Sequence, residues 1–504
     1  MEHSPEAHTR LTAELARKLK RPEVYRWLVT SGYYPESYVL PPCFVVTKHP
    51  SFGKRYFTHT KKKFVLKESE FQEVHFPKTE LTDRTFGIID PELHSDIAAT
   101  IAQNWKTIIA ALFHRDNKVC CYSFPVPLDA HAPGRIGGLR SGRMIYEFIE
   151  MAENDIASVA HKFRYLIKTD VKNCYPSIYT HSIAWALHGK KVVRKPANRH
   201  NYSFVGNRLD KLFQYSNDTC TNGIPVGPVA SDIVAELVLS GVDRLLSKAL
   251  PTGVLVVRFK DDYRILTKSE ADGRAVIKAL QASLKEFKLE LNDEKTEVHR
   301  LPDGVFRKWV SQYHAINPRP KAYYHFKRFR EVYLSVLTID QDNPGCGVID
   351  RFLADLVNKE YGLRVELKKR TLPKVLSLLL MLGDRRIKAF PKVLAIIESI
   401  LRTPFGAAHC DSIVEHLDEF LQRLSEREQD NRYLIAWICY FLRSNSLESK
   451  LTRKYEFSDP VVRATFTSRS TIFSGAKDFK LFSGVKDVSK KVRLLRYLDV
   501  FKPQ

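Results

Sequence analysis

The chain has 504 residues, more than one ordinary hydrophobic core supports, so two or three domains are expected. Its composition, with 44% hydrophobic and 11% aromatic residues, is typical of a folded protein and excludes a disordered or fibrous one. The 80 Lys and Arg residues exceed the 57 Asp and Glu residues, and the formal net charge of +23 favours a polyanionic partner such as nucleic acid over a merely basic surface. The eight cysteines show no zinc-ligand spacing and no disulfide framework.

The N-terminal residues 1–27 are charged and amphipathic and lack the apolar core of a signal peptide. The longest apolar stretch, Val375 to Leu382, is far too short to cross a bilayer. We therefore expect a soluble, cytoplasmic protein without a membrane partner. Residues 8–30 have the apolar spacing of a helix, and the prolines of "GYYPESYVLPPCF" (32–44) then predict extended or turning backbone.

The middle of the chain mixes helical and strand-like patterns, which predicts an α+β domain. The predicted elements are a helix over 93–113, a strand-like segment over 118–128, a helix over 143–163, a strand that ends near Asp170, a turn at 222–228 that opens a long helix, a strand–turn–strand over 255–266 and a helix over 271–288.

The character of the sequence changes near residue 310. From 350 to 445 the chain is a series of amphipathic helices, such as "LPKVLSLLLMLG" and "SIVEHLDEFLQRL", which recur without a clean consensus. We therefore predict two domains, an α+β domain over 1–310 and an all-α, HEAT-like helical-repeat domain over 311–504. The helical region would guide a product or join subunits.

Two adjacent carboxylates lie in the middle of the strand-forming segment "LVVRFKDDYRIL" (255–266). Asp is a poor strand residue and like charges repel, so the pair costs stability unless a partner compensates. An Asp-Asp dipeptide in a hairpin most often serves only the turn. Strand alternation predicts that Phe259 and Asp261 point to one face, and that Asp262 points to the other face or along the turn.

Asp170 offers a third carboxylate, because it ends an apolar strand in "YLIKTDVKNCYPSI" (165–178). Mg²⁺ takes oxygen ligands in octahedral geometry, and two-metal phosphoryl transfer uses ions about 3.5–4 Å apart. Asp170 and Asp261 as shared ligands, with Asp262 nearby, would meet that demand. We therefore predict a site for Mg²⁺, with Mn²⁺ as the alternative ion.

Four segments occur in an order that resembles the motifs of the reverse transcriptase family. "TDVKNCYPSI" is similar to motif A, "NGIPVGPVASDIVAELVL" to motif B, "FKDD" to motif C and "LELNDEKT" to motif D, over roughly residues 165–300. The resemblance implies a right-hand palm-and-fingers domain and a nucleotidyltransferase that adds deoxynucleotides to a 3′-hydroxyl. It also implies that Asp170 and Asp261 hold the metals, assisted by the Val171 carbonyl, and that Asp262 completes the site.

The resemblance further implies four positions that contact the nucleotide or its pyrophosphate. Tyr175 would lie beneath the sugar of the incoming nucleotide and exclude a 2′-hydroxyl, although taken alone it reads as a core aromatic. Lys295 would protonate or neutralise the departing pyrophosphate, and its alternative is an exposed lysine at a helix end. Gly227, in the motif B turn, would bind the nucleotide together with Val171.

Two departures from the common reverse transcriptase pattern indicate which branch of the family the chain resembles. Pro225-Val226-Gly227 stands where many members have Pro-Gln-Gly, and nothing after residue 310 is similar to a small thumb or an RNase H domain. Together with "GYYPESYVLPPCF" these features resemble the bacterial abortive-infection (Abi) branch, most of all its prophage-borne members. That branch implies antiviral defence against phage, homo-oligomers, and template-independent, protein-primed DNA synthesis from dNTPs, with the single-stranded DNA product attached covalently through a tyrosine. No motif marks the priming residue among the 22 tyrosines.

Two other functions stay open from the sequence. One is a conventional RNA-templated reverse transcriptase, as in retron or group II intron systems, which Val226 and the missing thumb disfavour. The other is a non-catalytic nucleic-acid-binding protein, which the clustered acids disfavour because folding alone does not favour unpaired carboxylates.

Overall fold

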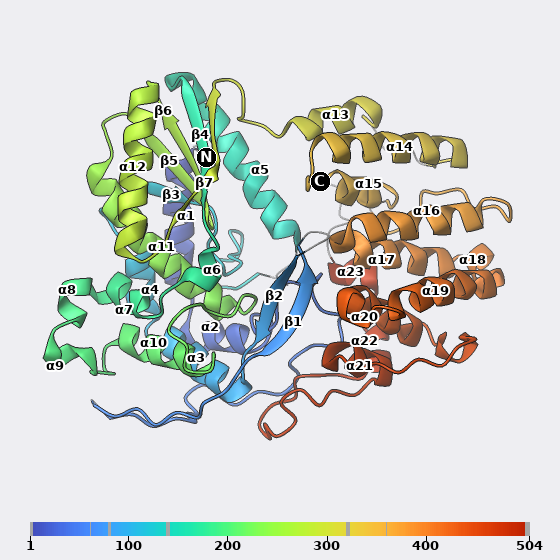
Figure 1. Cartoon of the computed structure of the whole chain (residues 1–504), viewed down its shortest axis with the longest axis horizontal. Helices are drawn as coiled ribbons and strands as arrows, with labels where there is room; N and C mark the ends of the chain where they lie inside the picture. Colours follow the sequence, from blue (N-terminus) through green and yellow to red (C-terminus); the bar gives the residue numbers. More distant parts are fainter. Residues whose placement is uncertain are drawn as a thin grey trace.

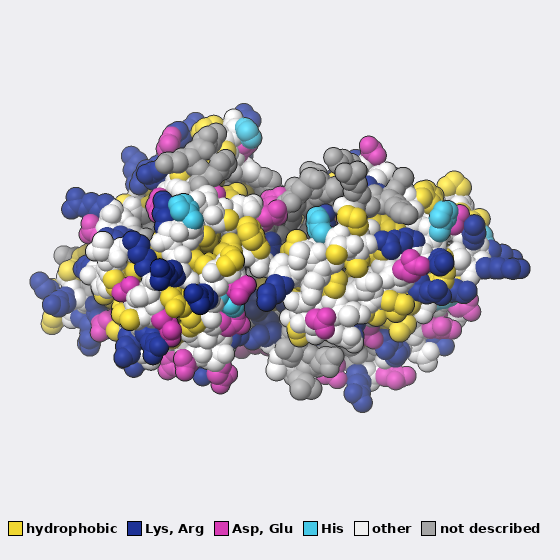
Figure 2. All heavy atoms as spheres, turned by 90° about the horizontal axis from the view of Figure 1, so that it is seen from above, with side chains coloured by type: hydrophobic (Ala, Val, Ile, Leu, Met, Phe, Trp, Pro, Cys, Tyr) yellow, Lys and Arg dark blue, Asp and Glu magenta, His cyan; other side chains and the backbone are white. Residues whose placement is uncertain are grey.

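The computed structural model describes residues 4–60, 62–78, 82–137, 142–318, 323–358 and 360–498, and for 142–146 it describes the backbone alone. A mixed α/β half, which runs from blue to yellow in Figure 1, lies beside a half built from the helices α13 to α23. Figure 2 shows the surface narrowing between these two lobes, with Lys and Arg side chains scattered over both.

A five-stranded sheet forms the centre of the α/β half. Its strand order is β3-β5-β6-β4-β7, in which β3 and β5 are parallel and all other neighbours are antiparallel. The predicted strand near Asp170 and the predicted strand–turn–strand are both confirmed. The strands are β3 (Val119–Cys121), β4 (Tyr165–Val171), β5 (Leu255–Phe259), β6 (Asp262–Thr267) and β7 (Leu291–Arg300).

The two faces of this sheet are buried against different helices, as the alternation of side chains along a strand requires. Ile167 and Ile265 belong to a core shared with α11 (Val229–Ala249) and α12 (Glu270–Glu286), whereas Leu166 belongs to a smaller core on the side of α5 (Gly142–Val159).

Two helices that we predicted as continuous are each broken. The predicted helix over 8–30 ends at Lys18 and restarts at Arg21, because Pro22 lacks an N–H and its ring clashes with the preceding turn. The predicted helix over 93–113 is interrupted at Asn104, whose side-chain amide donates to the Thr100 carbonyl at 2.9 Å and so competes with the helical backbone.

The remaining helices of the α/β half pack around the sheet and the hairpin. They are α1 (Pro5–Lys18), α2 (Arg21–Val29), α3 (Pro91–Gln103), α4 (Trp105–Leu112), α6 (Cys174–Ser177), α7 (His181–His188), α8 (Lys190–Val193), α9 (Pro196–Arg199) and α10 (Val205–Tyr215).

The second half is a stack of amphipathic helices, as predicted for residues 350–445; its HEAT-like repeat character and the division at residue 310 stay predictions. None of the helices in the described part of the chain combines the length and the apolar character needed to cross a bilayer. The helices are α13 (Lys308–Ile316), α14 (Phe326–Asp342), α15 (Val348–Asp355), α16 (Leu372–Arg385), α17 (Phe390–Leu401), α18 (Pro404–Ala408), α19 (Cys410–Ser425), α20 (Glu428–Ser444), α21 (Pro460–Thr467), α22 (Val485–Ser489) and α23 (Leu494–Leu498).

The two halves share one hydrophobic core through the segment 33–46 and the antiparallel hairpin of β1 (Gln72–Pro77) and β2 (Asp83–Ile88). The Tyr433 hydroxyl on α20 donates to the Tyr38 carbonyl at 2.6 Å, and the rings of Tyr433 and Phe76 meet at 4.9 Å. The hairpin therefore stands between the sheet and the helical stack, as Figure 1 shows.

Candidate active site

Two of the predicted carboxylates face each other across neighbouring strands. Asp170 at the end of β4 is paired with Asp262 at the start of β6, so their side chains share one face of the sheet. Asp261 lies in the turn just before β6, and its carbonyl accepts a hydrogen bond from the Val171 N–H at 3.1 Å. The structure thus brings Asp170, Asp261, Asp262 and Val171 to one edge of the sheet.

The hairpin turn differs from the expected alternation. Phe259 is paired with Asp262, which leaves Lys260 and Asp261 as a two-residue turn. Lys260 has a φ of 51°, in the left-handed region, and this reverses the chain before alternation can continue. The prediction that Phe259 and Asp262 point to different faces is therefore wrong, because opposed residues of an antiparallel pair share a face.

Lys295 reaches the site through an irregularity in β7. Lys168 pairs with Glu297 and Asp170 pairs with Asn292. Residues 293–296 of β7 therefore bulge opposite Thr169, the one residue of β4 between these two pairs. The bulge turns the Lys295 ammonium toward Asp170, and the Nζ–Oδ2 distance is 2.8 Å. The alternative placement of Lys295 at a helix end is wrong, since the residue belongs to a strand.

The three carboxylates lie close enough to influence one another. Asp262 is exposed at the edge of the sheet, but neighbouring protein atoms still displace part of the water around its carboxylate, and the charges of Asp261 and Asp170 act in the same direction. Together they raise the pKa of Asp262 to about 6. The hydrogen bond to Asp170 raises the pKa of Lys295, which stays charged at neutral pH. A cation is thus already drawn to this cluster.

The donor set suits a hard divalent cation. One oxygen of Asp170, Oδ1, is buried and has no hydrogen-bond partner, while the other oxygen is bound by Lys295. A buried carboxylate oxygen without a donor is costly unless a cation binds it. No group of three or more His, Cys, Asp or Glu side chains is arranged to hold a metal within the residues that the structure describes, so binding would need Lys295 and the Asp side chains to adjust.

Tyr175 is held by the long helix that follows the motif B turn. Its hydroxyl donates to Asp232 in the first turn of α11, and its carbonyl accepts from the Ile224 N–H at 3.1 Å. The ring is half-buried and packs against the core shared with α11. Tyr175 therefore combines a core contact with a fixed position beside the carboxylate edge.

The motif B turn needs glycine at residue 227. Gly227 has a φ of +124°, and a Cβ there would lie 2.8 Å from Cγ of Pro35. Val226 packs against the core shared by the two halves, and its carbonyl accepts from the Gly87 N–H at 2.8 Å. The turn is thus clamped between the segment 32–44 and β2, and the nucleotide-binding role of Gly227 stays a prediction.

Sequence reasoning missed three groups that hold Tyr175 and the turn before Asp262 in place. Asp232 holds Tyr175. Glu36, which is buried, lies 3.9 Å from the Lys260 ammonium in the turn between β5 and β6, and Arg258, also buried, donates to the Lys260 carbonyl at 2.8 Å. A charged residue inside the apolar strand "LVVRF" was the one available signal for Arg258. Nothing in the sequence connects Glu36 with Lys260, because the two residues lie 224 positions apart along the chain.

The chain is similar to a protein-family model and to solved structures. No curated protein matches the chain. Among solved structures, apo telomerase from Candida tropicalis truncated from its C-terminal domain is 13% identical with a TM-score of 0.32, and the match covers 47% of this chain and 51% of that one. Apo telomerase from Candida tropicalis is 10% identical (TM-score 0.34; 74% and 69% covered), and telomerase from Candida albicans with a TWJ fragment of telomeric RNA is 12% identical (TM-score 0.29; 77% and 65% covered).

The chain spans about half the length of the first of these structures. The family model described as reverse transcriptase (RNA-dependent DNA polymerase) matches residues 123–322, a range that contains all seven predicted site residues. Residues 123–322 therefore form a reverse transcriptase domain.

Proposed function

We propose that this protein is a DNA polymerase that adds dNMP units to a growing 3′-hydroxyl. The observation that carries the proposal is the meeting of Asp170, Asp261 and Asp262 at one sheet edge, with a buried Asp170 oxygen that has no donor. Folding alone does not favour such a cluster, and perturbed carboxylates gather at catalytic sites. The family match supports the same class of reaction.

The site residues would divide the work as follows. Asp170, Asp261 and Asp262 would hold Mg²⁺ or Mn²⁺, with the Val171 carbonyl beside them, and the bound ions would polarise the phosphate and activate the attacking hydroxyl. Lys295, charged and within reach of Asp170, would neutralise or protonate the pyrophosphate leaving group. Gly227 would keep the motif B turn close to the nucleotide.

The finer proposal is template-independent, protein-primed synthesis in abortive infection against phage. Val226 supports it, because this side chain packs into the core where glutamine is common, and so offers no polar group to a template. The basic charge supports a nucleic-acid product, single-stranded DNA attached through a tyrosine of the protein. Homo-oligomers and a cytoplasmic location complete the proposal, and the helical region would guide the product or join subunits.

Labelling without primer or template tests this function. Purified protein incubated with Mg²⁺ and each labelled dNTP should acquire label that survives denaturing electrophoresis and is released by protease. Removal of Mg²⁺ by a chelator should abolish the signal. Label that forms only after a primed RNA template is added would establish the RNA-templated reaction instead, which the name of the matching family favours. Absence of label in both conditions would overturn the polymerase proposal.

Replacing Tyr175 should relax sugar discrimination. In Tyr175→Ala the ring no longer fills the space beneath the sugar, so incorporation of rNTP relative to dNTP should rise by roughly 10–100-fold, the scale of one steric contact. Tyr175→Phe is the matched control, because it keeps the ring and removes only the hydroxyl that donates to Asp232. The measurement is the ratio of kcat/KM for dTTP and UTP. An unchanged ratio in Tyr175→Ala would place the ring in the core alone.

A further inference from the structure

A polar cavity lies apart from the sheet edge that carries Asp170, Asp261 and Asp262. It has a volume of about 710 Å³, opens to solvent, and is lined by residues of α7, α8, α9 and α10, with Lys288, just after α12, on another side. This size is within the range of pockets that hold small ligands. Five Lys or Arg side chains line it, and Asp210 is the one acidic side chain among the residues that line it.

The positive charges of this cavity are largely uncompensated. Lys190 is paired with Glu286 at 3.0 Å, and Asp210 is paired with His181 at 2.5 Å. Arg194, Arg199 and Lys288 have no carboxylate partner among the residues that the structure describes. Cations that gather in a hollow without counter-charges attract an anionic ligand.

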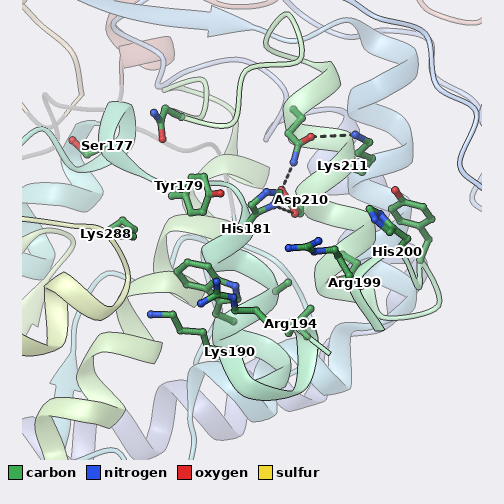
Figure 3. Close-up of a pocket in the computed structure, with 17 residues that line it drawn as sticks. Ser177, Tyr179, His181, Lys190, Arg194, Arg199, His200, Asp210, Lys211 and Lys288 are labelled. Atoms are coloured by element: carbon green, nitrogen blue, oxygen red, sulfur yellow. Dashed lines mark hydrogen bonds and ion pairs between the residues drawn. The ribbon is translucent and has the colours of Figure 1, made fainter. Parts of the chain in front are cut away.

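The cavity has a rigid polar floor. The buried Gln214 amide donates to Asp210 at 2.6 Å and to the Thr180 hydroxyl at 3.3 Å, so Asp210 and His181 are held in place. Figure 3 shows Arg199 extending toward the His181–Asp210 pair, while Lys190 and Arg194 lie together on another wall. Cationic groups thus approach the space from more than one side.

One wall of the cavity is formed by residues that directly follow the motif A segment in the sequence. Tyr179, four residues after Tyr175, lines the cavity and forms a β-bridge with Asn222, which precedes the motif B turn. The Gly223 N–H donates to the Ile178 carbonyl at 2.9 Å, which ties the two segments together. The cavity therefore lies beside the segments that carry Tyr175 and the motif B turn.

We propose that this cavity binds nucleotide phosphates of single-stranded nucleic acid. Guanidinium and ammonium groups bind phosphate oxygens, and the half-buried rings of Tyr179 and Tyr202 provide aromatic surface of the kind that accompanies single-strand binding. The cavity is an accessory site, and its binding requires no nucleotidyl transfer, so this proposal and the proposed polymerase reaction can fail separately.

The test uses the double variant Arg194→Ala/Arg199→Ala, whose side chains are exposed and whose loss leaves the core intact. The matched control is Lys278→Ala/Lys285→Ala, which removes the same charge from exposed positions of α12 that do not line the cavity. Binding of a fluorescent oligothymidylate is measured by anisotropy against salt concentration, without divalent cations. Labelled dTTP is titrated in parallel.

Two lost phosphate contacts should reduce the magnitude of the slope of log K against log[salt] by roughly 1.4. If variant and wild type bind equally in about 1 M salt, the variant then binds roughly 25-fold more weakly than wild type in about 0.1 M salt. The control variant should keep both slope and affinity. Loss of dTTP binding without loss of oligothymidylate binding would assign the same phosphate chemistry to a free nucleotide. If the Arg194→Ala/Arg199→Ala variant binds both probes as the control does, the proposal is overturned.

Discussion

Asp261→Asn should lower the rate of dNTP incorporation on the order of 10²–10³-fold, without loss of fold. Asparagine keeps the size of the side chain in the turn between β5 and β6 and removes the charge that would hold a divalent cation. The loss is of the size found when one preorganised electrostatic group is removed from an active site. Single-turnover incorporation of labelled dNTP at saturating Mg²⁺ is the measurement.

Stability separates this effect from unfolding. Asp261 is among the charges that raise the pKa of Asp262, so the cluster repels itself when no cation is bound. Asp261→Asn should therefore leave the melting temperature unchanged or slightly higher, as is common when an active-site charge is removed. Asp303→Asn, the same change at an exposed site in the loop after β7, should alter neither activity nor stability. Full activity in Asp261→Asn would contradict the site assignment.

The parts of the site that local sequence determines were predictable. A strand that ends near Asp170 and a hairpin that carries Asp261 and Asp262 follow from β-branched and apolar runs with polar ends, and both are confirmed. The long helix after the motif B turn, α11, follows from its apolar content in the same way. The hydrophobic pattern of each of these elements is complete within about a dozen residues, so it can be recognised from the local sequence alone.

The remaining contacts of the site depend on the register of the strands and on packing between residues far apart in the chain. Neither can be read from a single sequence. Lys295 reaches Asp170 because β7 bulges, and a bulge leaves no mark in the alternation of a strand that is mostly exposed. The wrong expectation for Asp262 has the same origin, since Lys260 adopts a left-handed conformation that residue type alone does not favour. The docking of the hairpin on α20 joins residues as far apart as Tyr38 and Tyr433.

Arg258 belongs to β5, one strand of the hairpin that carries Asp261 and Asp262, and its side chain is fully buried. Its guanidinium is 2.8 Å from Asp243 and 3.0 Å from Glu236, and it donates to the Lys260 carbonyl at 2.8 Å. The Tyr263 hydroxyl donates to the other oxygen of Asp243 at 2.8 Å. The network thus joins α11 to both strands of the hairpin and fixes the turn that carries Asp261.

Arg258→Met should therefore destabilise the protein by about 3–5 kcal/mol, because removing one partner leaves buried carboxylates without their counter-charge. Arg274→Met is the matched control: Arg274 lies 2.6 Å from Glu270, a shorter ion pair, but its side chain is 74% exposed, so the loss should stay within about 0.5 kcal/mol. Urea unfolding followed by circular dichroism measures both. A small loss in Arg258→Met would show that the network can repack without the guanidinium.

The pH dependence of Arg258→Met identifies the cause of its instability. Burial raises the pKa of Asp243, and Arg258 opposes that rise, so loss of the guanidinium moves the pKa further upward. Between the unfolded value of about 4 and the raised folded value, the folded variant holds a proton that the unfolded chain has released. Its stability therefore falls as pH rises through that interval, and the gap between wild type and variant should be smaller at about pH 5 than at about pH 8. A further change, Asp243→Asn in the Arg258→Met background, should remove much of this pH dependence, because the carboxyl that titrates is gone. If the stability gap between wild type and Arg258→Met instead stays constant with pH, the loss comes from packing rather than from the unpaired charge.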